Sequence, residues 1–390
     1  MDFTATEEQT AAAGLAARIF GDLATHERLA AAGTDSDAEL WKALCAAGLP
    51  EAVGEAGLLG LVLLAEEQGR TTAQVPFTAS CVYGLLAVAR HGTKTQRARL
   101  LPGFEDGTSV ATGAFPATGA VRVGPDGRLS GEVAWVPWLR DATHVLVPDD
   151  EHTLWLVPVA EEMAARETEE VGEAGKREEV GEAGEALGVV GTGEAGEAPG
   201  VAGAAGAPAV VVTPVELTAP WAAGRLVLHR ARGERLGGPG SYEDVLAMAR
   251  IAFAGLQAGV CAGSLARAVA HTSAREQFGR PLATRQAVQL RAADAHMDTE
   301  AIRVTAYEAA WRLDHGLPVE EQALTAAWWA SEAGKRVVHA GQHLHGGTGA
   351  DLDHPVHRHF LWGRQLDAYL GCGTALLAEL GGLLANGEPT

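Results

Sequence analysis

The chain is poor in cysteine and has no long uninterrupted apolar run. Its 390 residues include four cysteines, which lie far apart and form no CxxC pair. Cysteines with this spacing are typical of small buried side chains in a reducing compartment, and they predict neither a disulfide framework nor a zinc site. No stretch approaches the roughly 18 consecutive apolar residues of a membrane span. The N-terminal "MDFTATEEQT" lacks a basic segment followed by an apolar one, so we expect no secretory signal and a cytoplasmic location.

Positive charge is scarce as well. The chain carries 30 Lys and Arg against 50 Asp and Glu, which gives a net charge of −20. This excess disfavours nucleic acid and anionic membrane surfaces as partners, because both are themselves negatively charged. The charge is uneven, since residues 161–200 contain 12 Glu and only 3 Lys or Arg. The rest of the chain is therefore only moderately acidic.

The same acidic segment is repetitive. The sequence "EEVGEAG" occurs at 169–175 and again at 178–184, and runs of Ala and Gly follow to about residue 208. Such a stretch buries little apolar surface, and that surface is too small to offset the entropy lost on ordering its backbone. We predict a disordered insertion over about 161–208 with no assigned role. An interaction tail is the alternative.

The first of three predicted regions is helical and covers residues 1–110. Capping-box spacing occurs twice in it, at Thr4 with Glu7 and at Ser36 with Glu39. The second region, 111–235, contains short runs rich in Val, Leu and Trp that are bounded by Gly, Pro and Asp, which predicts strands. Because short loops such as the Asp126-Gly127 turn separate these runs, we expect an antiparallel sandwich or barrel.

The third region, 241–390, returns to helical patterns. It predicts four long antiparallel helices, which form a four-helix bundle. Ser241 and Asp244 are expected to cap the first of these helices, which is rich in small residues that let neighbouring helices approach closely. The predicted fold class is therefore α+β, with a helical N-terminal domain, a β middle domain that contains the insertion, and a C-terminal four-helix bundle.

Two stretches of the third region contain residues suited to ligand binding. In "AREQFGRPLATRQAV" (274–288) a cation, an aromatic ring and a turn glycine follow a helix, and together they could hold a planar anion such as a nucleotide. The alternative is a helix end at which Arg275 complements the dipole. In "HLHGGTG" (343–349) paired glycines expose backbone N–H groups to phosphate, although such pairs also simply end helices.

Taken together, these stretches resemble the acyl-CoA dehydrogenase family. The motif "REQFGRP" with Gln286 downstream, and "LHGGTG" further along the chain, match two family motifs, and the opening "MDFTATEEQ" and the helix–β–helix order match as well. The resemblance covers the chain apart from the insertion. The stretch "GADLDHPVHRHFLW" is similar to actinobacterial members that act on steroid side chains or other bulky acyl groups, many of which are two-subunit enzymes.

The resemblance implies FAD, a homo- or hetero-oligomer, and α,β-dehydrogenation of an acyl-CoA. Electrons would pass to an electron-transfer flavoprotein or another acceptor. A carrier-protein thioester is less favoured as substrate, because the sequence offers no obvious basic patch for an acidic carrier. The resemblance implies that Arg275, Phe278 and Gln286 contact the FAD of a neighbouring subunit. It places His343, Gly346 and Gly347 at the motif that approaches the pyrophosphate. It places Trp135 beside the flavin. His343 stands where the family usually has Gln.

One family motif is largely missing. A loop of the β domain usually reads like T-E-P-G-A-G-S-D and contacts flavin and thioester, whereas the nearest stretch here is "AFPATGAVRV". Gly119 and Ala120 match, but the acidic residue, the proline position and the serine do not. The resemblance therefore implies altered flavin and substrate contacts at this loop.

The catalytic base is also missing from its expected place. The family reaction needs a carboxylate to remove the α proton while the thioester carbonyl is polarised. In most members this base is the Glu of a Y-E-G-T stretch, which falls here on "YLG" and puts Leu370 at the position of the base. A shift of one or two residues would place Cys372 there, and a second family position falls near Ala249. Asp367 and Glu243 are alternative acids, although Glu243 more plausibly caps a helix.

Histidines are concentrated near the same motifs, since six of the 14 lie between 339 and 359. His354, His357 and His359 do not share one helical face, and the family uses no metal, so we predict no metal site. His343 or His345 could assist proton transfer, because imidazole titrates near neutrality. Hydrogen bonding to phosphate or backbone is the alternative.

The sequence thus predicts an FAD-dependent acyl-CoA dehydrogenase subunit that lacks the usual glutamate and works in a heteromer. In that arrangement Arg275 and Phe278 would complete the FAD site of a partner that supplies the base. A self-sufficient enzyme with a displaced acid is one alternative. A structural or binding paralogue without flavin is the other.

Overall fold

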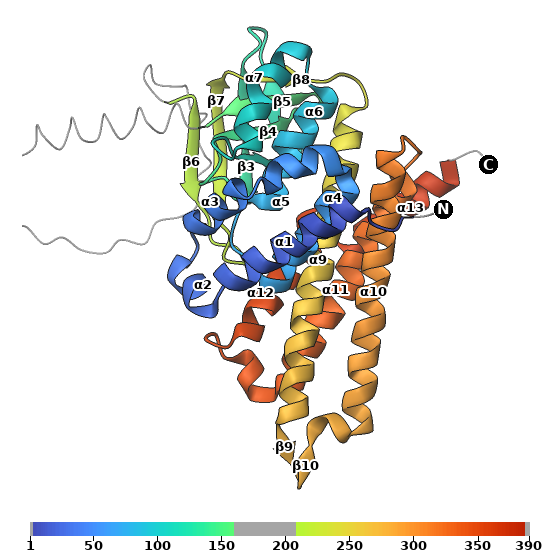
Figure 1. Cartoon of the computed structure of the whole chain (residues 1–390). Helices are drawn as coiled ribbons and strands as arrows, with labels where there is room; N and C mark the ends of the chain where they lie inside the picture. Colours follow the sequence, from blue (N-terminus) through green and yellow to red (C-terminus); the bar gives the residue numbers. More distant parts are fainter. Residues whose placement is uncertain (1–2, 160–207, 387–390) are drawn as a thin grey trace, which may run out of the picture.

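The computed structural model describes residues 3–159 and 208–386, so the disorder predicted for about 161–208 lies outside the described residues. Helices from both ends of the chain enclose one side of a pair of β-sheets, and the long C-terminal helices extend away from the sheets (Figure 1). This order confirms the predicted succession of helices, strands and helices.

The N-terminal part is helical, as predicted. Its helices are α1 (Glu7–Leu23), α2 (His26–Ala32), α3 (Ala38–Ala46), α4 (Leu49–Thr71), α5 (Phe77–Ser80), the π-helix η1 (Cys81–Leu86), α6 (Ala87–His91) and α7 (Lys94–Glu105). Both predicted caps are wrong by one or two residues. Thr6 forms the capping box of α1 with Gln9. Asp37 caps α3, because the Ser36 hydroxyl instead donates a 2.5 Å hydrogen bond to Asp141.

The strands form two four-stranded sheets that face each other. One sheet has the order β1 (Ala111–Gly113), β4 (His144–Pro148), β5 (Leu154–Pro158), β8 (Glu234–Leu236), and the other has the order β2 (Val121–Val123), β3 (Leu129–Val136), β7 (Gly224–Ala231), β6 (Val210–Pro214). Buried Val and Leu side chains from both sheets fill the space between them, which confirms a sandwich. All pairings in the two sheets are antiparallel except β1 with β4, which is parallel.

The C-terminal part begins with α9 (Ser241–Ala274), whose C-terminus leads through the hairpin β9 (Glu276–Gln277) and β10 (Arg280–Pro281) and the short helix η2 (Leu282–Thr284) into α10 (Gln286–Asp314). It continues with α11 (Glu320–His345), the 3-10 helix η3 (Gly346–Ala350), α12 (Pro355–Tyr369) and α13 (Gly373–Asn386). The predicted fourth helix is therefore two helices, and the chain breaks at Gly371, whose φ of 113° favours glycine.

The predicted cap of α9 is also wrong. Gly240 occupies the N-cap position without a side-chain hydrogen bond, and the Ser241 hydroxyl instead bonds to the backbone of Gly238. Asp244 faces α6, where Arg90 and His91 bind its carboxylate at 2.8 and 2.7 Å. The carboxylate thus joins the N-terminal helices to the start of α9.

Small residues do let α9 approach its neighbour, as the sequence predicts. A Cβ atom placed on Gly259 would lie 1.9 Å from the Glu66 carbonyl oxygen of α4, and one on Gly255 would lie 2.8 Å from the Val62 side chain. Neither contact leaves room for a larger residue. The glycine face of α9 therefore fixes how closely α4 packs against the bundle.

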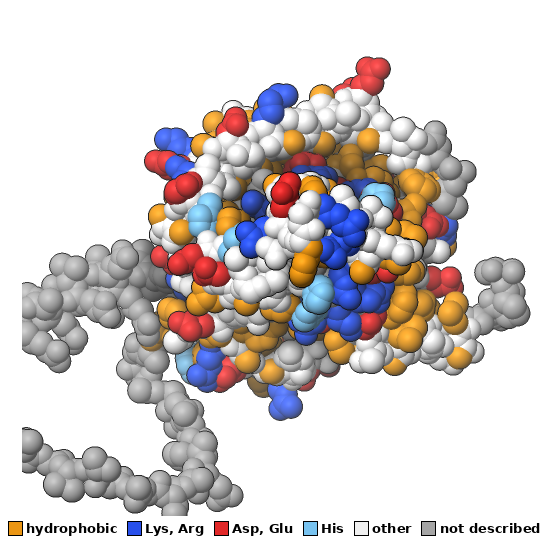
Figure 2. All heavy atoms as spheres, turned by 90° about the horizontal axis from the view of Figure 1, so that it is seen from below, with side chains coloured by type: hydrophobic (Ala, Val, Ile, Leu, Met, Phe, Trp, Pro, Cys, Tyr) orange, Lys and Arg blue, Asp and Glu red, His pale blue; other side chains and the backbone are white. Residues whose placement is uncertain are grey.

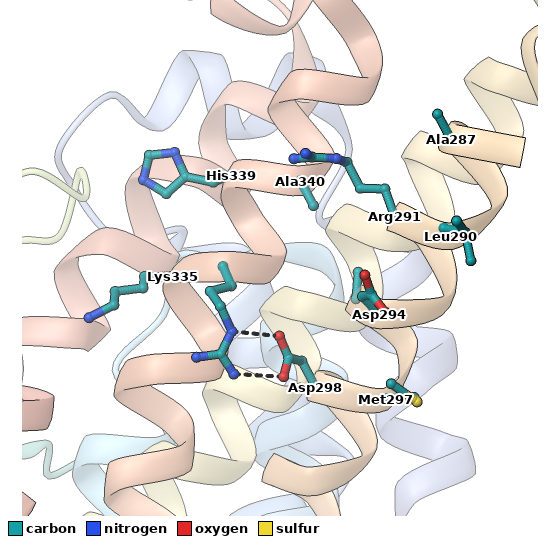
Figure 3. Close-up of a pocket in the computed structure, with 11 residues that line it drawn as sticks. Ala287, Leu290, Arg291, Asp294, Met297, Asp298, Lys335, His339 and Ala340 are labelled. Carbon is teal, nitrogen blue, oxygen red and sulfur yellow. Dashed lines mark hydrogen bonds and ion pairs between the residues drawn. The ribbon is translucent and has the colours of Figure 1, made fainter.

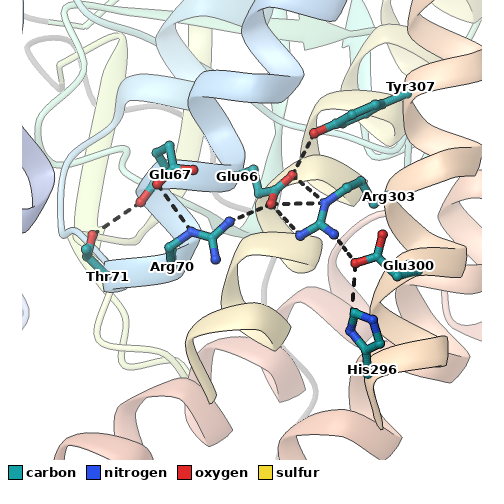
Figure 4. Close-up of polar contacts among 8 residues, drawn as sticks. All are labelled: Glu66, Glu67, Arg70, Thr71, His296, Glu300, Arg303 and Tyr307. Carbon is teal, nitrogen blue, oxygen red and sulfur yellow. Dashed lines mark hydrogen bonds and ion pairs between the residues drawn. The ribbon is translucent and has the colours of Figure 1, made fainter. Parts of the chain in front are cut away.

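A buried carboxylate ties the same helices together. Glu66 of α4, whose side chain is 5% exposed, accepts from Arg70 at 2.8 Å, from Arg303 at 2.6 Å and from the Tyr307 hydroxyl at 2.9 Å. Figure 4 shows both guanidinium groups converging on this carboxylate. Because a buried charge needs such partners, these contacts fix α10 against α4.

Two helical stretches of the described chain are long and apolar enough to cross a membrane by length and composition alone, although the sequence lacks an uninterrupted apolar run. They are Ser241–Ala274 and Pro355–Asn386, and a third candidate arises if the bent pair Ala38–Ala46 and Leu49–Thr71 is taken as one span. In the fold, 94% of the apolar window of Ser241–Ala274 is buried inside the protein, against 22% for Pro355–Asn386.

Candidate active site

The region around Leu370 is closed. Leu370 ends α12, is 6% exposed and belongs to the main apolar core. The hollow beside it measures about 20 Å³, and its lining includes Arg250, Gln257 and apolar side chains but no Asp or Glu. Pockets that bind small organic ligands typically measure roughly 300–1,000 Å³. The hollow is therefore far smaller than such a pocket, and among the residues that the structure describes no carboxylate lines it.

Aromatic side chains occupy the space beside this hollow. The Tyr369 ring packs edge-on against Phe253, with ring centres 4.8 Å apart, and lies 5.7 Å from Trp135. Its hydroxyl forms a 2.9 Å hydrogen bond with the hydroxyl of Tyr83. Burial raises the pKa of both phenols well above the usual range, so both stay neutral.

From Tyr83 a stack of rings continues toward the surface. Tyr83, Phe115, Tyr242 and His152 follow one another with ring centres 5.1, 5.5 and 4.2 Å apart. The Tyr242 hydroxyl accepts a 3.0 Å hydrogen bond from the backbone N–H of Ala117. The loop "AFPATGAVRV" is thus fastened to α9 in this chain. We refer to Tyr83, Phe115, Tyr242, Phe253 and Tyr369 as the aromatic plug.

None of the alternative acids or nucleophiles reaches the hollow at Leu370. Asp367 accepts a 2.5 Å hydrogen bond from Ser331 and pairs with Arg364 at 3.0 Å. Glu243 is exposed in the first turn of α9, where its carboxylate lies 3.7 Å from His152 Nδ1. Ala249 is fully buried. Cys372 is exposed, and a hydrogen bond with Thr374 lowers the pKa of its thiol.

The only charged side chain that lines the hollow is a cation. Arg250 is 9% exposed and binds Glu379 of α13 through two hydrogen bonds of 2.8 and 2.7 Å. The sequence alone does not reveal this pair, because its residues lie 129 positions apart and belong to different predicted helices. The pair neutralises the cation next to Leu370 and directs it toward α13.

In contrast to Leu370, the β9–β10 hairpin at the C-terminal end of α9 is exposed to solvent. Phe278 is 88% exposed and has a φ of 56°, a left-handed conformation that non-glycine residues rarely adopt. The guanidinium of Arg285 lies over its ring, 4.8 Å from the ring centre. Arg275 is the C-cap of α9, and Gln286 is the exposed first residue of α10. Figure 2, viewed toward this end, shows Lys, Arg and His side chains gathered around it.

The glycine motif lies at the same end of the molecule. His343, Gly346 and Gly347 are exposed where α11 passes into η3. Gly346 has a φ of 65°, and this positive φ explains why glycine occupies the position. At Gly347 the φ is ordinary and a Cβ atom would meet no other atom within 4 Å, so internal packing does not require glycine there. The exposed backbone of Gly346 and Gly347 leaves room for a diphosphate to approach, so these residues fit FAD.

The structure thus separates the predicted cofactor residues into two sets. Six of them gather at the tips of α9, α10 and α11: Arg275, Phe278, Gln286, His343, Gly346 and Gly347. The seventh, Trp135, lies on β3 beside the aromatic plug. Among the residues that the structure describes, no group of three or more His, Cys, Asp or Glu side chains is placed to hold a metal ion.

An open groove of about 910 Å³ runs between α10 and α11. Arg336 of α11 pairs with Asp298 of α10 across it through hydrogen bonds of 2.9 and 2.7 Å. Figure 3 shows Asp298, Leu290 and Met297 on the α10 side. Leu290, Met297 and Val304 are 56%, 65% and 48% exposed and recur every seven residues, so they share one face of α10. This apolar face begins in the second turn of α10, which follows the β9–β10 hairpin and η2.

The motifs and the geometry agree with known proteins. Family models described as the acyl-CoA dehydrogenase N-terminal and C-terminal domains match residues 6–108 and 238–379. The acyl-CoA dehydrogenase FadE27 of Mycobacterium tuberculosis is 31% identical over 99% of each chain. A solved structure of a Tcur3481-Tcur3483 steroid ACAD variant is 38% identical over 97% of this chain and 98% of its own, with a TM-score of 0.80. The ChsE4-ChsE5 complex from Mycobacterium tuberculosis is 29% identical over both full chains, with a TM-score of 0.82. The chain belongs to the acyl-CoA dehydrogenase family.

Proposed function

We propose that this chain is the non-catalytic subunit of a heteromeric, FAD-dependent acyl-CoA dehydrogenase. The observation that carries the proposal is the hollow of about 20 Å³ at Leu370, which no carboxylate lines. A proton can be abstracted only by a base within hydrogen-bond reach, and the candidate acids Asp367 and Glu243 point elsewhere. The partner subunit would therefore supply both the acyl pocket and the glutamate.

This chain would contribute the adenosine end of the cofactor site. Phe278 and Arg285 form an exposed stacked pair, and Arg275 lies at the adjoining helix end. Gly346 and Gly347 offer backbone that a diphosphate can approach closely. In the family reaction, bound FAD supplies the hydride acceptor while a carboxylate removes the α proton. Here the role of the chain is to bind and orient the cofactor in its partner's site.

The apolar face of α10 supports a heteromer. Leu290, Met297 and Val304 would be covered by the partner subunit, because their face is continuous with the hairpin that carries Phe278. A partner seated on the hairpin is thus in place to bury this row as well. The relatives named above include two complexes, Tcur3481-Tcur3483 and ChsE4-ChsE5.

By the likeness to the steroid ACAD, we propose a steroid or other bulky acyl thioester of CoA as substrate. An electron-transfer flavoprotein or another acceptor would reoxidise the cofactor. The self-sufficient enzyme is less well supported, because the aromatic plug fills the space next to Leu370. A flavin-free paralogue is less well supported, because Phe278 is 88% exposed and a Cβ atom on Gly347 would meet no other atom within 4 Å, so the core of the described chain requires neither residue.

Co-purification with a glutamate-bearing homologue tests the proposal. The full chain and its partner are expected to elute as one complex with one FAD per pair of subunits. Phe278→Ala should lower the FAD content at least fivefold, while Leu352→Ala, which changes another exposed side chain (78%), should not. Full FAD retention by the Phe278→Ala complex would overturn the proposal.

A further inference from the structure

Three histidines form a cluster that the proposed function leaves without a role. His271 lies in the last turn of α9, His345 ends α11, and His354 is the N-cap of α12. The ring centres of His271 and His345 are 4.7 Å apart, and those of His345 and His354 are 5.0 Å apart. We call these three side chains the imidazole cluster. It gathers residues from three helix ends at one place.

The cluster lies between the two motifs proposed to hold FAD. His271 is one turn before Arg275, and the Arg275 N–H donates to the His271 carbonyl at 2.8 Å. His345 directly precedes Gly346. The imidazole cluster thus joins the end of the cationic hairpin motif to the start of the glycine motif.

The charged neighbours of the cluster are nearly all cations. Arg275, the C-cap of α9, acts on His271, and Arg267 of α9 acts on His354. In the part of the chain that the structure describes, neither arginine forms an ion pair.

The remaining neighbours add little negative charge. Asp351, from the loop before α12, is the one acid that acts on His354, and it is exposed. From α4, the Arg70 carbonyl bonds to His359, whose pKa burial lowers to about 4, so that His359 is neutral. An excess of cations over acids favours an anion as ligand and disfavours a metal ion.

The hydrogen bonds of the rings fix which nitrogen can take a proton. His345 Nδ1–H donates to the Gly341 carbonyl at 2.7 Å, which leaves Nε2 as the acceptor in the neutral ring. His354 Nδ1 accepts from the Val356 N–H at 3.2 Å, so protonation there would break the cap of α12. A proton entering the cluster therefore goes to His345 Nε2 or to His271.

We propose that the imidazole cluster binds the diphosphate of an adenosine diphosphate moiety and takes up a proton from solvent as it does so. The proposal rests on the proposed function, because it assigns the cluster to the same FAD that Arg275 and Gly347 would hold. The added N–H gives the diphosphate a charged donor, and the bound anion in turn stabilises the imidazolium.

In the free chain the surroundings of His271 and His354 favour the neutral form of both rings. Burial, then interaction with the neighbouring His345 and Arg275, lowers the pKa of His271. Burial, then His345, His271 and Arg267, lowers the pKa of His354. The negative charge of a bound diphosphate stabilises the imidazolium form and so raises these pKa values. The affinity of the chain for the diphosphate therefore rises as pH falls. Coupling to one proton strengthens binding by up to about tenfold per pH unit.

Calorimetric titration of the full chain with ADP tests this coupling. At pH 7, titrations in two buffers with different heats of ionisation should reveal uptake of close to one proton per ADP. The double variant His271→Gln, His345→Gln removes the two rings that can take the proton but keeps a polar side chain at both positions, and it leaves the His354 cap of α12 in place. It should abolish most of the proton uptake and weaken ADP at pH 6 about tenfold, with less effect at pH 8.

Controls separate this proposal from the proposed function. His229→Gln alters an exposed histidine on β7, at the opposite end of the molecule (Figure 1), and should change nothing. Arg275→Gln should weaken ADP at every pH. If Arg275→Gln weakens ADP but the histidine variant keeps full proton uptake, the imidazole proposal falls and the proposed function stands. If ADP binds at no pH between 6 and 8, both fall.

The source of the diphosphate is distinguished by competition. FAD should displace ADP, while inorganic phosphate at the same concentration should not. Displacement by CoA but not by FAD would assign the cluster to the substrate's nucleotide and overturn its assignment to the cofactor.

Discussion

The hydroxyls of Tyr83 and Tyr369 lie 2.9 Å apart in the buried core, although the two residues are 286 positions apart in the chain. Tyr83 belongs to η1 of the N-terminal helices, and Tyr369 is the last residue of α12, directly before Leu370. This hydrogen bond holds the end of α12 against the N-terminal helices. It keeps the position expected for the base inside the core.

Removing one hydroxyl of this pair should destabilise the chain. Tyr83→Phe leaves the Tyr369 hydroxyl buried without a partner, which costs about 1–3 kcal/mol of the free energy of unfolding. The double variant Tyr83→Phe, Tyr369→Phe removes both groups and should regain part of that loss. Guanidinium unfolding of the three variants measures the coupling. Purely additive losses would show that the hydroxyls do not interact.

Placing the family's glutamate at position 370 should not create an active site in this chain. Leu370→Glu puts a carboxyl group beside a hollow of about 20 Å³, where Arg250 is already paired with Glu379. Burial raises the pKa of such a carboxyl, so the variant should lose about 3 kcal/mol of stability at pH 8.

The sign of the pH dependence distinguishes this account from simple misfit. The part of the Leu370→Glu loss that comes from charge should vanish below about pH 4, the pKa of Glu in the unfolded chain, and grow as pH rises. Leu370→Gln has nearly the same shape without the charge and should be destabilised equally at all pH values. A glutamate variant that bleaches flavin on acyl-CoA addition would refute the closed-site account.

The exposed hairpin should be dispensable for folding. Because Phe278 is 88% exposed, Phe278→Ala should change the free energy of unfolding of the isolated chain by less than about 0.5 kcal/mol. Phe278→Gly should even stabilise it slightly, since the φ of 56° suits glycine. Thermal unfolding of the isolated chain measures both. A large loss of stability would assign Phe278 a structural role within the subunit.

Asp244 should make the contact between α6 and α9 sensitive to acid. Burial raises the pKa of its carboxyl, but hydrogen bonds from His91 and Arg90 lower it further, to about 2. The group therefore stabilises the fold above the unfolded pKa of 3.8, and this contribution is lost as pH falls through about 2. Asp244→Asn should cost about 1 kcal/mol at pH 7 and nothing near pH 2, because the site is partly exposed. Equal losses at both pH values would contradict the ion pairing.

Local patterns predicted the order of elements well but not the ends of helices. The sequence predicts four long helices over 241–390, yet Gly371 and Gly373 divide the last of them into α12 and α13. Thr6, not Thr4, caps α1. Spacing did not distinguish the two threonines, because each has a Glu or Gln three residues later. Caps depend on which carbonyls and amides the neighbouring elements leave free, and spacing alone does not determine this.

The candidate active site could be predicted from the sequence only where its residues belong to local sequence motifs. Arg275, Phe278 and Gly347 fell within two recognisable stretches, and the fold brings those stretches to one end. The aromatic plug was not predictable, because Tyr83, Phe115 and Tyr242 come from separate regions and meet only through tertiary packing. The pairing of Arg250 with Glu379 was hidden for the same reason.

An anaerobic visible spectrum tests the central claim most directly. The full chain would be purified alone and with a glutamate-bearing homologue, and spectra would be taken before and after addition of a steroid acyl-CoA. We expect the chain alone to show no flavin that bleaches, and the complex to show flavin that does. Bleaching by the chain alone would contradict the account, since a working base and acyl pocket would then have to lie within this subunit.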